Sequence, residues 1–227
     1  MKQLLVSDYD GTLFTDETTL LDNIEKIKKF QAEGNVFIIA TSRSYDSIIK
    51  EVKKYQIPYD YIFSNIGAGI FDAAGKILYA DFIPQNEKEK IETILEQYSY
   101  MDITRFGILE PQEKESKEIV GYKIKGETEI LEKLQNLFNS VLSGFDVSLK
   151  KNKIKLFLNY RNNSKEKAIM TLIKMFPKYQ DFEVITVGDD DVDFGMLQKF
   201  NGYRMEKCST LLAENIIKMV SSVGELV

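Results

Sequence analysis

The stretch VSDYDGT, residues 6–12, follows the apolar run LLV, residues 4–6, near the start of the chain. This order predicts a short buried strand that ends in a glycine-containing loop. Asp8 and Asp10 are two positions apart, so on a strand leaving the sheet their side chains point the same way. Gly11 lets the backbone turn, and the amides after it can donate hydrogen bonds to phosphate oxygens. The pattern indicates phosphoryl transfer, although a chance pair of acids in a surface turn is the alternative for this stretch alone.

The absence of histidine restricts the possible chemistry. None of the 227 residues is a histidine, which excludes Ser-His-Asp and Cys-His catalysis, histidine metal sites and histidine proton transfer. Acid–base chemistry near neutral pH must then use carboxylates, lysine, tyrosine, cysteine or metal-bound water. Carboxylates with Mg²⁺ fit best. The single cysteine, Cys208, cannot form an internal disulfide and agrees with a reducing compartment.

Composition and charge favour a globular protein of the cytoplasm. Hydrophobic residues make up 44% of the chain and charged residues 29%, and no apolar run approaches the roughly 18 to 20 residues that cross a bilayer. The first apolar run ends at Ser7, too early for a signal peptide. The net charge of −5 is spread over interspersed acids and bases, so we expect no nucleic-acid or membrane partner. We expect a monomer or homodimer.

Apolar strands separated by helices predict the core of the fold. Strand-length apolar runs lie at residues 4–6, 36–40, 61–63 and 184–187. Such strands, apolar on both faces, argue for a Rossmann-like parallel sheet covered by helices. Helical periodicity and helix-stop signals predict helices at 20–33, 44–55, 165–176, 194–199 and 210–220. A hairpin is predicted within residues 70–79, and a short strand at 203–205.

The pattern changes between about residues 84 and 160. The expected elements are a helix at 87–98, strands near 103–109 and 119–125, a helix at 128–139, and strands near 147–149 and 154–158. Short connections between adjacent strands imply an antiparallel sheet with helices on one face. We therefore expect an α/β fold with a core of residues 1–84 and 160–227 and an inserted α+β domain, αββαββ, of residues 85–159.

Polar groups follow three of the predicted core strands. Asp8 and Asp10 follow the first strand, Thr41 follows the strand at 36–40, and Asp189 follows the last. In open parallel sheets ligands bind outside the carboxyl ends of the strands, so these groups should converge on one crevice. Several carboxylates close together are unfavourable without a cation. Oxygen ligands beside a phosphate favour Mg²⁺.

This ordered set resembles the haloacid dehalogenase superfamily, and within it the Cof-type phosphatases of subfamily IIB. Residues 8–12 are similar to the first motif of the family, Thr41 to the second, Lys165 to the third and residues 188–197 to the fourth. The αββαββ segment is similar to the smallest version of the family's type C2 cap. The resemblance spans the whole chain and implies a Mg²⁺-dependent phosphatase that hydrolyses a small phosphorylated metabolite, such as a sugar phosphate, through an aspartyl-phosphate.

The resemblance also implies roles for single residues. Asp8 would attack phosphorus, and Asp10 would protonate the leaving alcohol and then activate water. The phosphate would be held by Gly11, Thr41, Ser42 and Lys165. The metal would be bound by the carboxylates of Asp8 and Asp189 and the main-chain carbonyl of Asp10, with Asp193 as a further ligand or as the holder of a metal-bound water. Arg43 could reach an anionic part of the substrate.

The fourth motif departs from the family pattern at two positions. The family commonly has glycine where Asp190 stands and asparagine where Val192 stands. Asp190 is tolerable because aspartate visits left-handed backbone angles more readily than most residues. Val192 cannot make the side-chain hydrogen bonds of an amide, so we expect lower activity than in close relatives.

A basic turn in the insertion is a second candidate for substrate binding. It contains Lys150, Lys151, Lys153 and Lys155. These lysines could receive a sugar phosphate or a carboxylate. A solvated charged hairpin is the simpler interpretation of the same residues.

Three alternatives to a phosphatase stay open. A sugar phosphomutase of the phosphomannomutase type shares the aspartyl-phosphate chemistry but needs a second phosphate site. A receiver-like phospho-acceptor also combines acids, threonine and lysine, yet lacks the acid two residues beyond its nucleophile and has no inserted domain. A degenerate homologue that only binds a metabolite is the third, because of Val192.

Overall fold

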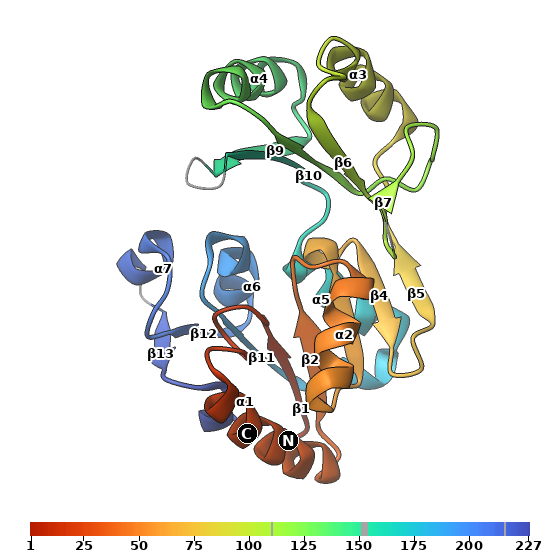
Figure 1. Cartoon of the computed structure of the whole chain (residues 1–227). Coiled ribbons are helices and arrows are strands. Elements are labelled where there is room, and N and C mark those ends of the chain that lie inside the picture. Colours follow the sequence, from red (N-terminus) through yellow and green to blue (C-terminus); the bar gives the residue numbers. More distant parts are fainter. Residues whose placement is uncertain (110, 151–153, 216) are drawn as a thin grey trace. The chain divides into compact units, whose positions relative to one another are not determined.

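The computed structural model describes residues 1–109, 111–150, 154–215 and 217–227, and the chain forms two compact units (Figure 1). The core unit comprises Met1–Tyr79 and Ser164–Val227, and the inserted unit comprises Ala80–Asn163. The limits predicted from the sequence differ from these by a few residues. In the described ranges, no helix has the length and apolar character needed to cross a bilayer.

The core unit is built on an eight-stranded sheet in the order β13-β12-β11-β1-β2-β3-β4-β5. The pairs from β13 to β3 are parallel, and β3 pairs with β4 antiparallel. The α/β class expected from the sequence is therefore confirmed. The strands are β1 (Gln3–Ser7), β2 (Val36–Ala40), β3 (Tyr61–Ser64), β4 (Gly69–Asp72), β5 (Ile77–Ala80), β11 (Glu183–Gly188), β12 (Asn201–Met205) and β13 (Lys218–Val220).

Helices connect these strands. They are α1 (Glu17–Ala32), α2 (Tyr45–Tyr55), α5 (Lys165–Met175), α6 (Phe194–Lys199) and α7 (Thr210–Glu214), with short 3₁₀ turns η1 (Asn65–Gly67), η3 (Pro177–Tyr179), η4 (Asp191–Asp193) and η5 (Val223–Glu225). Local capping fixes where they begin. Asp16 accepts a hydrogen bond from the Thr19 amide at the start of α1, and Ser164 accepts one from the Lys167 amide at the start of α5. The cap at Ser164 fixes Lys165 as the first residue of α5.

The central strands are buried on both faces. Every residue of β2 is buried, and so are four of the five residues of β1. The β1 side chains of Leu4 and Val6 belong to a cluster that also contains Ile169 and Leu172 of α5. Burial of this kind stabilises the sheet by about 25 cal/mol per Å² of apolar surface. It explains why the strands read as unbroken apolar runs, and it holds the ends of β1 and β11 side by side.

The inserted unit contains a five-stranded antiparallel sheet in the order β7-β6-β8-β10-β9, with two helices on one face (Figure 1). Its elements are α3 (Gln85–Glu96), β6 (Asp102–Phe106), β7 (Pro111–Gln112), β8 (Gly121–Lys125), α4 (Thr128–Val141), β9 (Phe145–Lys150) and β10 (Lys155–Tyr160). The two-residue strand β7 is the only described addition to the expected αββαββ order. Arg105 of β6 makes a bidentate pair with Glu92 of α3, which also accepts from Tyr122 of β8.

The predicted helix at residues 210–220 is wrong. The helix α7 ends at Glu214, because Asn215 is extended (φ −97°, ψ 150°) and its side-chain amide donates back to the Leu211 carbonyl. Residues 218–220 then form β13, which pairs parallel with β12 at the edge of the sheet. The ladder bonds to β12 and the burial of Val220 favour a strand here over a longer helix.

Candidate active site

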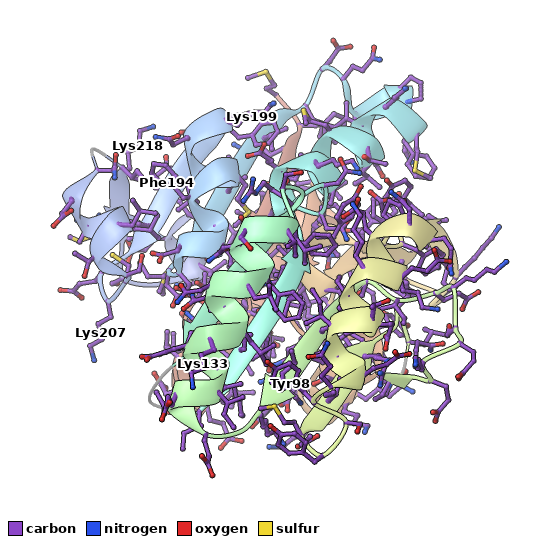
Figure 2. The ribbon with its side chains drawn as sticks, turned by 90° about the horizontal axis from the view of Figure 1, so that it is seen from above. Tyr98, Lys133, Phe194, Lys199, Lys207 and Lys218 are labelled. Carbon is purple, nitrogen blue, oxygen red and sulfur yellow. The ribbon has the colours of Figure 1, made fainter. Side chains whose placement is uncertain are left out.

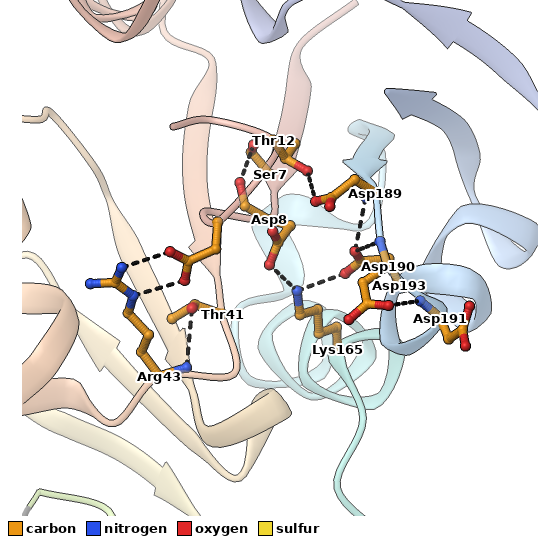
Figure 3. Close-up of polar contacts among 11 residues, drawn as sticks. Ser7, Asp8, Thr12, Thr41, Arg43, Lys165, Asp189, Asp190, Asp191 and Asp193 are labelled. Atoms are coloured by element: carbon orange, nitrogen blue, oxygen red, sulfur yellow. Dashed lines mark hydrogen bonds and ion pairs between the residues drawn. The ribbon is translucent and has the colours of Figure 1, made fainter. Parts of the chain in front are cut away.

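Four charged side chains from distant parts of the sequence meet at the ends of two adjacent strands (Figure 3). Asp8 follows β1, and its amide donates to the Val187 carbonyl of β11 at 2.9 Å. Asp189 follows β11, and Asp193 lies in the turn η4 just beyond it. Lys165 reaches the same place from the first turn of α5. The convergence expected from the sequence is present for these four residues.

Lys165 is the centre of this group. It is 1% exposed, and its Nζ donates to Asp8 Oδ1 at 2.5 Å and to Asp193 Oδ1 at 2.6 Å. Burial alone would lower the pKa of this ammonium, but the carboxylates of Asp193 and Asp8 outweigh burial and hold the pKa above its ordinary value. Lys165 therefore stays protonated at neutral pH and keeps a positive charge between two acids.

Asp8 is tuned in the opposite direction from an ordinary paired acid. Burial raises its pKa to about 8, against the opposing attraction of Lys165 and with a further contribution from the negative charges of Asp193 and Asp189. One lysine is therefore too little positive charge for three neighbouring acids. A second cation beside Asp8 would favour its ionised form.

Asp193 fixes the loop after β11. Its Oδ2 accepts hydrogen bonds from the amides of Asp189 and Asp190, both at 3.1 Å. A side chain at Gly188 would collide with Asp193, so glycine is needed for this close approach. Asp190 has an extended backbone (φ −114°, ψ 165°) and caps the Asp191 amide at 2.8 Å. The expectation that Asp190 needs left-handed angles is therefore wrong, because the position is an ordinary N-cap.

The loop after β1 holds Asp189 from the other side. Thr12 Oγ1 donates to Asp189 Oδ1 at 2.6 Å. Gly11 has φ +87°, and a Cβ at this position would collide with the Asp189 carboxylate. The Gly11 amide donates to the Phe14 carbonyl at 3.0 Å within the loop. Gly11 thus permits the close approach of the two loops, while its predicted contact with phosphate stays a prediction.

The donor set fits a hard divalent cation. Carboxylate oxygens of Asp8, Asp189 and Asp193 lie within 4.8 Å of one another, and oxygen ligands suit Mg²⁺ or Ca²⁺. Both oxygens of Asp193 already accept from Lys165 and the loop amides. Asp8 and Asp189 each have one oxygen, Oδ2, that accepts from no side chain or amide in the described ranges. Those two carboxylates are the better ligands, with Asp193 orienting the loop behind them.

Asp10 points away from this group and pairs with Arg43 (Figure 3). Arg43 Nε donates to Asp10 Oδ2 at 2.8 Å, and Nη2 donates to Oδ1 at 2.6 Å. The guanidinium also reaches Glu51 at 3.3 Å and lies 5.0 Å from the centre of the Tyr9 ring. Arg43, predicted to reach the substrate, is therefore engaged by two carboxylates and an aromatic ring in this structure.

The remaining predicted phosphate ligands lie after β2. Thr41 is buried, and its Oγ1 accepts a hydrogen bond from the Arg43 amide at 3.1 Å. Ser42 is exposed between them. The proposed role of these hydroxyls in holding phosphate stays a prediction. Their position at the end of a strand adjacent to β1 is consistent with that role.

Sequence reasoning missed three residues that contact the site. Thr12 is bonded to Asp189, and it stands in the opening stretch, where a hydroxyl next to Gly11 was a usable signal. Glu51 and Tyr9 both contact Arg43. No local pattern links Glu51 of α2 to the loops, because its contact depends on how the helix packs.

The comparisons with known proteins agree with this geometry. The sequence model of the family "haloacid dehalogenase-like hydrolase" matches residues 5–110. The chain belongs to this family. A protein of Buchnera aphidicola subsp. Baizongia pistaciae named "Putative phosphatase" is 36% identical over 86 residues, which are 37% of this chain and 32% of that protein. This match spans about a third of the relative's length. An uncharacterized protein of Mycoplasma capricolum is 26% identical, and the match covers 88% of each chain.

Solved structures of this hydrolase family share the fold along the whole chain. The structure of TM0651 from Thermotoga maritima matches with a TM-score of 0.81 at 19% identity and covers 100% of this chain and 98% of that one. The sugar phosphatase BT4131, described as subclass IIB of the superfamily, matches with a TM-score of 0.74 at 18% identity and covers 99% and 95% of the two chains. The family and fold predicted from the sequence are confirmed.

Proposed function

We propose that this hydrolase is a Mg²⁺-dependent phosphatase that cleaves a small phosphomonoester, such as a sugar phosphate, through an aspartyl-phosphate on Asp8. The observation that carries the proposal is the buried ammonium of Lys165, bonded to Asp8 and Asp193 with Asp189 beside them. Buried ion pairs are weak contributors to stability. Three acids gathered around one lysine at the strand ends are better explained by a metal and phosphate site.

The metal would be held by the side chains of Asp8 and Asp189. When bound, Mg²⁺ would supply positive charge that keeps Asp8 ionised and neutralises the phosphoryl oxygens. Asp193 would act one step back, because its oxygens hold Lys165 and the loop amides. The hydrogen bond from Thr12 orients Asp189 toward the same place.

The first half of the proposed reaction is a transfer to the enzyme. An oxygen of Asp8 attacks phosphorus, and the bond from phosphorus to the alcohol oxygen breaks. The electron pair leaves with that oxygen, which takes a proton from Asp10. Lys165 holds Asp8 in position and offsets the charge on the phosphoryl oxygens, and the hydroxyl of Thr41 donates to one of them.

The second half is hydrolysis of the aspartyl-phosphate. Asp10, now ionised, accepts a proton from a water molecule that attacks phosphorus, and the bond to Asp8 breaks to release inorganic phosphate. Asp10 is suited to proton exchange because it is 51% exposed. Its bidentate bond to Arg43 must open before it meets the leaving oxygen. Residue roles in both halves extend the family resemblance to these positions.

The test is phosphate release from a panel of phosphomonoesters with added Mg²⁺. We expect hydrolysis that requires Mg²⁺, is lost in EDTA and is lost in Asp8→Asn. Asp191→Asn is a matched control, because it removes one acid of the same loop without touching Asp8, Lys165 or Asp189. A sugar 1-phosphate in the panel separates the mutase alternative, which would give isomerisation without free phosphate. No turnover of any ester would favour a metabolite-binding homologue.

A further inference from the structure

The inserted sheet has one face that its own helices do not cover. α3 and α4 pack on the other face, where Tyr122, Ile124, Leu156 and Leu158 are buried with apolar residues of both helices. Side chains alternate along a strand, so the residues between these point to the open face. On β8 they are Lys123 and Lys125, and on β10 they are Lys155 and Phe157.

Three lysines form a row across this open face. Lys155 of β10 stands directly opposite Lys125 of β8 and directly opposite Lys150 of β9. The row continues to Asp102 of β6, which is opposite Lys125. A fourth lysine, Lys123, lies two positions before Lys125 on the same face of β8. We call Lys123, Lys125, Lys150 and Lys155 the lysine face.

The positive charge of the lysine face is not neutralised within the described residues. Lys125 pairs with Asp102 at 2.7 Å. For Lys123, Lys150 and Lys155 no described carboxylate lies within ion-pair distance. Lys123 lies 5.5 Å from the centre of the Phe106 ring. Partial burial and the charges of Lys125 and Lys155 lower its pKa, as expected where ammonium groups repel each other.

The usual structural reason for lysines on strands does not apply to two of these residues. Lysines protect exposed sheet edges from pairing with other chains, but β8 and β10 are interior strands of this sheet. Like charges directly opposite each other destabilise an antiparallel pair. Residues that break a local rule of stability are expected at functional sites. An anionic ligand would remove the repulsion between Lys125 and Lys155.

We propose that the lysine face binds an anionic group of the substrate other than the phosphate that is hydrolysed, so the preferred ester carries a second phosphate or a carboxylate. The inference rests on the proposed function, because it names the substrate class of that reaction. Charge complementarity selects this occupant, and Phe106 and Phe157 add apolar surface on the same face beside the lysines. Lys151 and Lys153, also predicted as part of a basic turn, lie outside the described residues.

The first arm of the test measures binding without catalysis. The full chain is titrated with inorganic pyrophosphate in EDTA, for wild type, Lys155→Gln, Lys123→Gln and the control Lys133→Gln. Lys133 projects from α4 on the helix-covered side of the same unit and pairs with Glu129 (Figure 2). Loss of one charged hydrogen bond should weaken binding by about fivefold or more in the two variants of the lysine face. Equal affinity in all four proteins would overturn the proposal.

The second arm separates a substrate group from a free effector. The ratio of kcat/KM for a sugar bisphosphate to that for the matching sugar monophosphate is measured in the same four proteins. We expect wild type and Lys133→Gln to prefer the bisphosphate, and Lys155→Gln to lose that preference with unchanged kcat/KM for the monophosphate. Equal losses for both esters would overturn the proposal. Failure of wild type to hydrolyse any ester would overturn the proposed function, and the binding arm would still decide whether the face binds anions.

Discussion

The ammonium of Lys165 lies 2.6 Å from Asp193 Oδ1, and both side chains are completely shielded from solvent. The same ammonium donates to Asp8 Oδ1. This pairing connects the start of α5 to the loop after β11 and to the end of β1. It gives one lysine two tasks, since it holds the loop that carries Asp189 and it orients the carboxylate expected to attack.

Removing this lysine should affect both stability and activity. In Lys165→Met the buried carboxylate of Asp193 loses its cation, so we expect the free energy of unfolding to fall by about 3–5 kcal/mol. Turnover should fall by a factor of about 10² or more, because a charge that stabilises the transition state is gone. Urea denaturation in EDTA and a phosphate-release assay measure the two effects. Lys174→Met, an exposed change on the same helix, is the control, and equal stability of the two variants would contradict the account.

The raised pKa of Asp8 predicts a pH effect on stability. Burial moves this pKa from 3.8 to about 8, so between these values the folded chain holds a proton that the unfolded chain has lost. The free energy of unfolding then falls as pH rises through this window. Urea denaturation in EDTA should show wild type losing stability relative to Asp8→Asn from about pH 5 to about pH 8. Parallel pH curves for the two proteins would argue against this ionisation.

The pair between Arg43 and Asp10 predicts which kinetic constant changes. Arg43→Lys keeps the charge but cannot make the bidentate contact. If the main task of Arg43 is to position Asp10, kcat should fall by about tenfold while KM changes little. If Arg43 instead binds the substrate, KM should rise at nearly constant kcat. Steady-state kinetics of the Lys and Gln variants, with Glu51→Gln as a neighbouring control, distinguish these outcomes.

Val192 gives a prediction in the direction of higher activity. Its side chain is 39% exposed in the turn η4, where the family commonly has asparagine. The loop is already held by Asp193 and by the N-cap at Asp190, so the missing amide should affect turnover more than stability. We expect Val192→Asn to raise kcat severalfold with an unchanged thermal midpoint. The idea is wrong if turnover does not change.

The core of the fold could be predicted because burial leaves a direct mark on the sequence. The strands β1, β2 and β11 are covered on both faces and therefore read as unbroken apolar runs. The edge strand β13 could not be predicted in this way. Only Val220 of its three residues is buried, and its spacing from the buried Leu212 also suits a helix. Pairing with β12 decided its structure, and pairing is not a local property.

The candidate site was predictable where it follows strand ends. Asp8 and Asp189 could be expected to meet because parallel strands end at the same edge. The contact between Arg43 and Asp10 depends on side-chain torsions and on Glu51 from α2, so residue order could not reveal it. The backbone of Asp190 was misjudged because a left-handed angle was inferred from the glycine common in the family, while the chain uses an N-cap.

The most direct test of the central claim is to trap the covalent intermediate on Asp8. Wild type is mixed with Mg²⁺ and a phosphate ester that it hydrolyses, quenched in acid within the first turnovers, and mapped by peptide mass spectrometry. The account predicts a phosphoryl group on the peptide that contains Asp8, present in Asp10→Asn and absent in Asp8→Asn and in EDTA. Phosphate release at the wild-type rate by Asp8→Asn, or a phosphoryl group on another residue, would contradict it.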